Sequence, residues 1–164
     1  MKIVLFSFGK LKTSGLRQAA DHYLRGLGGW VSIEEVELKA LAVPDKSLET
    51  RKRIQEQEAR LLLEQFAKKL SQSKNFYLVD EQGKSRATQD WAGQVRDWEN
   101  LGISEIAICV GSSLGFAPSL KQKAKDLLGF GPQTLSHELA RLVLLEQLYR
   151  AFSVLRGHPY HNEG

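Results

Sequence analysis

Cysteine is nearly absent from this sequence of 164 residues, which contains Cys109 alone. One cysteine cannot build a disulfide scaffold or a cysteine zinc site, and it suits a reducing compartment. Long apolar runs are missing too, since clean runs such as residues 106–110 and 142–145 are far too short to cross a bilayer. Ser7 and Gly9 interrupt the apolar N-terminal run, which makes it a poor signal peptide. We therefore expect a cytoplasmic protein.

Net charge is also small, because 23 lysines and arginines face 19 aspartates and glutamates, leaving +4. The charge is uneven: residues 1–30 carry +4, residues 31–116 carry −2 and residues 117–164 carry +2. A folded α/β domain can bring its two basic ends together, and a basic face would suit an anionic partner such as RNA. Ordinary solvated charge is the alternative interpretation.

Apolar segments alternate with helical patterns along the chain, whose hydrophobic content of 42% excludes a disordered protein. Strands are predicted over residues 2–8, 30–38, 76–79 and 106–110, with a stub at 134–135. Helices are predicted over residues 14–25, 45–70, 88–101, 118–128 and 137–155. The pattern indicates one α/β domain over residues 1–164, with a mostly parallel sheet covered by helices on both faces.

The last helix is apolar over most of its circumference, since 12 of the 17 residues from Leu139 to Leu155 are apolar or aromatic. A helix on the surface of a monomer needs a single apolar stripe. This helix is therefore either the central helix of the domain or packed between the sheet and a second subunit. The short chain favours the second interpretation, which predicts a homodimer.

Two glycine-containing loops should meet at one edge of the sheet. Gly111 and Ser112 follow one predicted strand, and residues 131–136 lie near another. Ligands of open α/β sheets bind at the carboxyl ends of the strands, where small residues leave backbone groups free to contact an adenine. Neither loop is rich in lysine or arginine, which disfavours a triphosphate and tolerates a cationic ligand.

Two other functions remain open from the residues alone. Residues 111–115 match the G-x-S-x-G pattern of a hydrolase, with Ser113 as nucleophile, a later histidine as base and Asp126 as acid. The delay of the next helix to Pro118 weakens this hypothesis, because the nucleophile should sit where the helix begins. A non-catalytic ribosome-binding domain, consistent with the basic ends, is the second alternative.

The C-terminal residues 156–164 place a tyrosine between two histidines. Pro159 restricts the backbone just before Tyr160 and His161, and an imidazole can act as a general base near neutral pH. We interpret the two side chains as acting on the RNA side of a reaction, with little contribution to folding. The histidine spacing lacks a third fixed ligand, so no metal is predicted.

Several motifs in their order along the chain resemble the RlmH family of SPOUT (α/β-knot) methyltransferases. They are Val79-Asp80 with Gly83-Lys84, Ile108 with Gly111 and Gly115, Thr134–His137, Leu148–Ala151 and His158–His161. The resemblance covers essentially the whole chain, and the last two motifs are its most specific part. It implies a homodimer that uses S-adenosyl-L-methionine to methylate N3 of a pseudouridine in helix 69 of 23S rRNA, in assembled ribosomes. It also implies a C-terminal trefoil knot, which topology rules alone would not predict.

The same resemblance marks the cofactor residues, and the chemistry of the implied reaction suggests the catalytic ones. The cofactor contacts fall on Val79, Gly111, Ser112, Gly131, Pro132, Gln133, Thr134, Leu135 and Ser136. Candidates for removing the N3 proton or stabilising the resulting charge are Arg150, Tyr160 and His161. Three positions depart from the family pattern: Ser112 replaces a glycine, Ser136 a proline and Asn162 a basic residue.

Overall fold

The computed structural model describes residues 1–71 and 75–160. Strands and helices alternate strictly: β1 (Lys2–Phe8), α1 (Leu16–Leu27), β2 (Ser32–Leu38), α2 (Leu48–Lys69), β3 (Phe76–Ser85), α3 (Thr88–Asn100), β4 (Glu105–Val110), α4 (Pro118–Lys121), β5 (Asp126–Gly129) and α5 (His137–Leu155). Within the described residues, no helix is long and apolar enough to cross a membrane.

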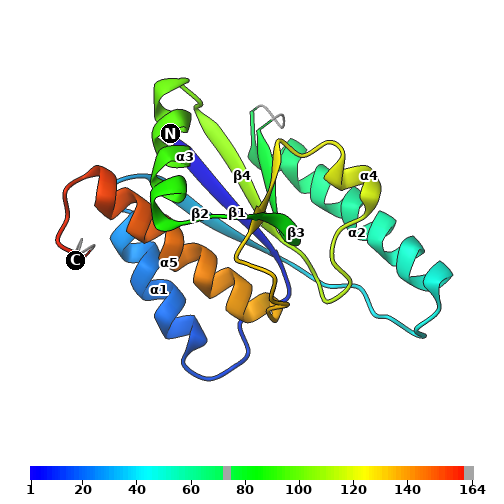
Figure 1. Ribbon diagram of the computed structural model, residues 1–164. Helices are drawn as coiled ribbons and strands as arrows, with labels where there is room; N and C mark the ends of the chain where they lie inside the picture. The colour runs from blue at the N-terminus through cyan, green and yellow to red at the C-terminus, as the bar shows by residue number, and fades with distance from the viewer. Residues whose placement is uncertain (72–74, 161–164) are drawn as a thin grey trace.

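The strands form one sheet in the order β2-β1-β4-β3-β5, and every neighbouring pair is parallel. Figure 1 shows α1, α3 and α5 on one face of the sheet, with α2 and α4 on the other. The predicted α/β fold with helices on both faces is therefore confirmed. Because all strands run the same way, their carboxyl ends meet at a single edge.

Strand β1 explains why the N-terminal run is apolar without alternation. Ile3 and Leu5 face the α1, α3 and α5 layer, whereas Val4 and Phe6 face α2. All four side chains are 0% exposed, because β1 lies inside the sheet and is covered on both faces.

Helix α5 packs between α1 and α3, so its central position accounts for most of its apolar surface. Leu144, Leu145 and Leu148 are completely buried within the single chain. A row of exposed or half-exposed side chains remains on the outer side of the helix. It consists of Leu139, Leu142, Val143, Glu146, Gln147, Arg150 and Val154.

Arg141 interrupts the apolar pattern of α5, yet its side chain is only 2% exposed. Its Nε donates to Glu35 at 2.7 Å and its Nη1 donates to Glu37 at 2.8 Å. Arg17 of α1 also donates to Glu35, at 2.9 Å. These ion pairs attach α1 and α5 to the edge strand β2, whose glutamates would otherwise face an apolar layer.

The C-terminal third differs from the prediction in two places. The expected helix over residues 118–128 is a single turn, α4, followed by strand β5, in which Leu128 is buried beside β3. The expected strand at residues 134–135 is a loop. A short apolar segment can form either a helix or a buried strand, and here pairing with β3 decides the outcome.

Strand β3 is also longer than predicted, because residues 81–84 continue the strand instead of ending it in a turn. Val79 and Lys84 both pair with Leu128, so the register shifts between them. Just beyond the shift, the backbones of Gly83 and Gly129 come very close. A Cβ atom on Gly129 would lie 2.2 Å from the carbonyl oxygen of Gly83, and one on Gly83 would lie 2.6 Å from the nitrogen of Gly129. Glycine is required at this crossing for space.

We expect Gly129→Ala to lower the free energy of unfolding by about 1–3 kcal/mol, since the methyl group would force two backbones apart. Gly93→Ala is the matched control, because Gly93 lies inside α3 and its new Cβ would have its nearest neighbour at 3.8 Å. That change should raise stability by about 0.5–1 kcal/mol. Urea unfolding measures the stability of both variants. An unfolding midpoint of Gly129→Ala at or above that of wild type would contradict the close approach of the Gly83 and Gly129 backbones.

Candidate functional site

A cavity of about 720 Å³ opens at the edge of the sheet where the strands end. Its walls come from the middle of β3, the end of β4, the loop from Gly111 to Phe116, and the segment between β5 and α5. Residues from α2, α4 and the first turn of α5 complete it. Its volume is within the range of small-molecule sites, about 300–1,000 Å³.

The structure gathers most of the predicted cofactor residues around this one cavity. Those that line it are Val79, Gly111, Ser112, Gln133, Thr134, Leu135 and Ser136. Gly131 and Pro132 belong to the same loop but do not line the cavity. Segments about 20 to 55 residues apart in the sequence therefore meet, as expected for loops at one edge of a parallel sheet.

Ser112 fixes the shape of the loop that follows β4. Its hydroxyl donates to the carboxylate of Glu58 at 2.7 Å and accepts from the backbone N–H of Leu114 at 3.2 Å. No non-glycine residue in the described chain has a positive φ, so a serine here causes no backbone strain. The departure from the glycine of the family pattern is thus accommodated by a hydrogen-bond partner.

Glu58 is a site residue that the sequence analysis missed. Its side chain comes from α2, is buried, and accepts a second hydrogen bond from the backbone N–H of Leu41 at 3.0 Å. A sequence signal was present, because Glu58 stands four residues from both Ile54 and Leu62, within the buried stripe of the helix. An acidic residue in such a stripe indicates a buried partner.

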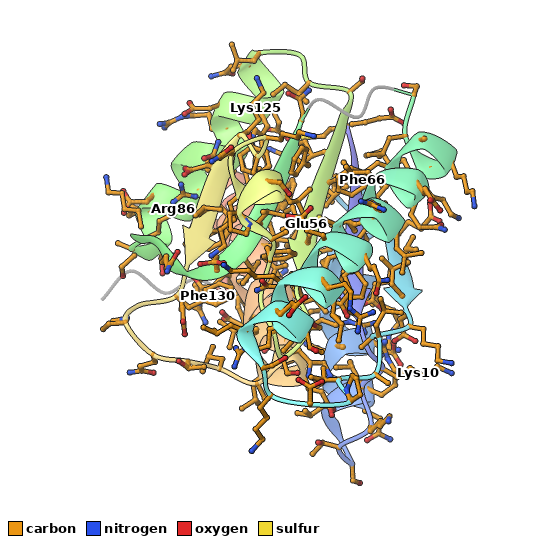
Figure 2. The ribbon with its side chains drawn as sticks, turned by 90° about the vertical axis from the view of Figure 1, so that its right-hand side faces the viewer. Lys10, Glu56, Phe66, Arg86, Lys125 and Phe130 are labelled. Carbon is orange, nitrogen blue, oxygen red and sulfur yellow. The ribbon has the colours of Figure 1, made fainter. Side chains whose placement is uncertain are left out.

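The opposite wall is held by side chains from β3 and α4. Asp80 forms an ion pair with Lys121 at 2.7 Å, and the hydroxyl of Thr134 donates to Glu81 at 2.6 Å. Phe130, labelled in Figure 2, stacks on Trp91 of α3 with ring centroids 5.8 Å apart. The contacts of Thr134 and Phe130 fix the segment after β5, which has no regular structure before α5.

Backbone groups are the main polar contacts that this segment offers to a ligand. Within the described residues, no backbone–backbone hydrogen bond uses the groups of Gln133, Thr134 or Leu135. A planar heterocycle placed there would find free donors and acceptors, with the ring of Phe130 nearby. The acidic side chains of Asp80 and Glu81 on the other wall tolerate a positively charged ligand.

Two of the predicted catalytic residues lie far from the cavity of their own chain. Ala140 lines the cavity, whereas Arg150 is ten residues further along α5, a rise of about 15 Å. The guanidinium of Arg150 pairs with Glu146 and lies 4.9 Å from the ring centroid of Tyr160. One chain therefore does not bring these residues to the cavity.

Tyr160 is half-buried and packs on its own chain, although little contribution to folding was expected of it. Its ring contacts Tyr149 with centroids 4.7 Å apart, and its hydroxyl lies 3.2 Å from Glu146 and 3.4 Å from the hydroxyl of Tyr23. Burial, followed by the contacts with Tyr23 and Glu146, raises the pKa of Tyr160 far above its usual value. In this arrangement the phenol of Tyr160 is held in its neutral, hydrogen-bonding form. The predictions for His161 and Asn162 lie outside the described residues.

The hydrolase hypothesis fails on geometry. Ser113 is exposed in the cavity loop, and no hydrogen bond joins it to a histidine or an acid in the described part of the chain. Asp126 begins β5, at the end of that strand opposite the cavity, where it pairs with Arg86. Ser113 and His137 both line the cavity but Asp126 does not, so the described residues form no triad.

Comparison with known proteins gives consistent matches over nearly the whole chain. Residues 1–161 match the family described as "Predicted SPOUT methyltransferase". Among similar proteins, the ribosomal RNA large subunit methyltransferase H of Bacillus cytotoxicus is 35% identical over 162 residues. Those of Streptococcus thermophilus and Exiguobacterium sibiricum are 34% and 32% identical. Each alignment covers 98% of this chain and 99% of the relative.

The hydrogen bond between Glu58 and Ser112 can be measured with a double-mutant cycle. Glu58→Leu should lower the free energy of unfolding by about 1–3 kcal/mol, because the donors of Ser112 and Leu41 lose their acceptor. In a Ser112→Ala background the same change should cost about 0.5–1.5 kcal/mol less. Glu64→Leu, on the exposed side of α2, is the control and should stay within about 0.5 kcal/mol of wild type. Strictly additive effects would show that the two side chains are independent.

Proposed function

Since the chain belongs to the SPOUT methyltransferase family, we propose that it transfers a methyl group from S-adenosyl-L-methionine to the ribosomal RNA of the large subunit. The observation that carries the proposal is the meeting of seven predicted cofactor residues at one cavity. The names of the three relatives supply the substrate class. The finer substrate, N3 of a pseudouridine in helix 69 of 23S rRNA in assembled ribosomes, follows from the RlmH resemblance.

The cavity suits S-adenosyl-L-methionine in size and in chemistry. That molecule would supply a methyl group attached to a positively charged sulfur. The free backbone groups from Gln133 to Leu135 would bind its adenine, and the turn at Gly111 and Ser112 would lie against the remainder. Nearby carboxylates at Asp80 and Glu81 would offset its positive charge, although each already has a partner.

Positioning is the main demand of methyl transfer, because the attacking nitrogen must approach in line with the bond that breaks. The proton on N3 must also leave. His137, in the first turn of α5, is the one imidazole among the described residues lining the cavity, which makes it a candidate proton acceptor. In this proposal the cavity walls would position the methyl donor, and His137 at the rim would take the proton.

A homodimer would bring the remaining candidate residues to the cavity. The outer row of α5 combines Leu139, Leu142 and Val143 near the cavity with Arg150 at the other end. Antiparallel contact between two copies of α5 would place Arg150 and Tyr160 of one subunit beside the cavity of its partner. Arg150, whose pKa is raised by its hydrogen bond to Glu146, would remain cationic and stabilise negative charge on the base. The C-terminal knot implied by the resemblance belongs to the same proposal.

Isothermal calorimetry with S-adenosyl-L-methionine tests the cavity. We expect one binding event per subunit in wild type and in Ser113→Ala, with the same affinity within twofold. Ser113→Trp should weaken binding by about tenfold or more, ~1.4 kcal/mol, because its ring would occupy the cavity mouth. A hydrolase would instead lose activity on Ser113→Ala. Absence of binding in the folded wild type would overturn the cofactor assignment.

Light scattering tests the dimer. Wild type should have twice the mass of the 18.4 kDa chain at micromolar concentration. Val143→Glu should shift it to a monomer, because a charge would enter the apolar part of the α5 row. Leu101→Glu is the matched control, since Leu101 is 75% exposed at the end of α3 and should leave the dimer intact. A monomeric wild type would contradict the interface.

A further inference from the structure

Two segments of the chain, residues 9–15 and 39–53, hold an excess of positive charge. They contain seven basic and two acidic residues, a net charge of +5 in a chain whose total is +4. We call the seven bases the basic rim: Lys10, Lys12, Lys39, Lys46, Arg51, Lys52 and Arg53. The rest of the molecule is therefore slightly acidic, and the positive charge is concentrated on these segments.

The basic rim lies at the edge of the sheet that also carries the cavity. Residues 9–15 follow β1 and residues 39–47 follow β2, so both segments leave the carboxyl ends of parallel strands. Figure 1 shows residues 9–15 (blue) at the lower left, whereas residues 39–47 and the start of α2 (cyan) lie at the lower right, so the rim extends across this side of the molecule. Arg51 itself lines the cavity, which makes the charged surface continuous with the candidate site.

Within the described residues the basic rim forms no ion pairs. Hydrogen bonds with Ser47 are the main cause of the lowered pKa of Asp45, and the interaction of Asp45 with Arg53 is the weakest cause. All seven side chains are exposed. In the part of the chain that the structure describes, none of them forms an ion pair within 4.0 Å, whereas eight other basic residues do. Asp45, one of the two acids present, accepts hydrogen bonds from the backbone of Ser47 and from the hydroxyl of Thr50. The rim charges repel one another in the free protein.

The position near the start of α2 also offers basic residues no gain in helix stability. Ser47 caps the helix by accepting from the N–H of Thr50 at 3.2 Å, and Arg51, Lys52 and Arg53 follow at once. The N-terminal end of a helix carries partial positive charge and favours acidic side chains. Helix stability therefore does not explain three consecutive bases at this position. Binding to a negatively charged partner would explain them.

We propose that the basic rim binds the phosphate backbone of ribosomal RNA and holds the RNA across the mouth of the cavity, an inference that rests on the proposed function. The seven bases come from separate segments and point to an extended chain of charges, instead of converging on one phosphate. Nucleic-acid backbones have that form, and exposed lysines and arginines bind them without reading sequence. The rim supplies affinity for the RNA and sets its position on the protein, while the cavity carries out the methyl transfer.

The test compares two double variants that change the net charge equally. Lys10→Glu with Lys52→Glu alters the rim at residues that do not line the cavity. Lys123→Glu with Lys125→Glu alters exposed bases elsewhere, and Figure 2 shows Lys125 at the opposite end of the molecule from Lys10. Binding to 70S ribosomes and to polyuridylate is measured as a function of KCl concentration, with S-adenosyl-L-methionine affinity measured in parallel.

The rim variant should bind both 70S ribosomes and polyuridylate at least tenfold more weakly than wild type. The slope of log K against log [KCl] should fall by about 1–2, as expected for the loss of two phosphate contacts. Its affinity for S-adenosyl-L-methionine should stay within twofold of wild type, and the control variant should bind ribosomes within threefold of wild type.

Three results would overturn the proposal. Equal losses in the two variants would assign the effect to total charge, and unchanged ribosome binding in the rim variant would remove the rim from the interface. A loss with ribosomes but none with polyuridylate would assign the rim to a ribosomal protein. Failure of the proposed function looks different, because wild type would then neither bind S-adenosyl-L-methionine nor methylate ribosomes.

Discussion

The parallel direction of all strands is the constraint on which the rest of the structure depends. Parallel strands need a crossover after each strand, so helices cover both faces and every strand has its carboxyl end at the same edge. The loops after β4 and β5 therefore converge with the middle of β3 on one cavity, although these segments are far apart in the sequence. The segments after β1 and β2 reach the same edge and bring the basic rim beside it.

Two buried charged residues connect this edge to the layers beneath it. Glu58 joins the loop before α2 to the loop after β4, and Arg141 joins α5 to the edge strand β2. A buried ion pair often contributes little net stability, because removing charges from water costs about as much as their attraction returns. The two residues instead determine the positions of their neighbours. The hydrogen bonds of each carboxylate or guanidinium are satisfied in only one arrangement of its partners, so the segments that they join are fixed.

Helix α5 links the parts of the proposed reaction. Its first turn borders the cavity, its buried side fills the space between α1 and α3, and its far end carries the contacts among Glu146, Arg150 and Tyr160. A continuous helix is rigid, so these two ends stay at a fixed separation within a subunit. A second subunit is the simplest way to bring the far end of one helix to the cavity of another, which is why catalysis and assembly are joined in the proposal.

The sequence by itself determined the fold class, the location of the cavity loops and the limits of most elements. Residues 2–8, 106–110 and 137–155 were predicted well, because their apolar patterns are long or clean enough to identify buried strands and a helix. Local pattern also brought Gly111, Ser112 and residues 133–136 to one site, since loops that follow parallel strands must share an edge.

Only the tertiary structure decided the remaining features, which depend on contacts between distant segments. Residues 126–129 became a strand instead of a helix because β3 lies beside them, and Gly83 continued a strand because it crosses Gly129. The buried carboxylate of Glu58 accepts a hydrogen bond from Ser112, which is 54 residues away in the sequence. Arg150 and Tyr160 proved distant from the cavity of their own chain. Sequence patterns report which side of an element is buried, whereas the identity of the neighbour on that side is set by the packing of the whole chain.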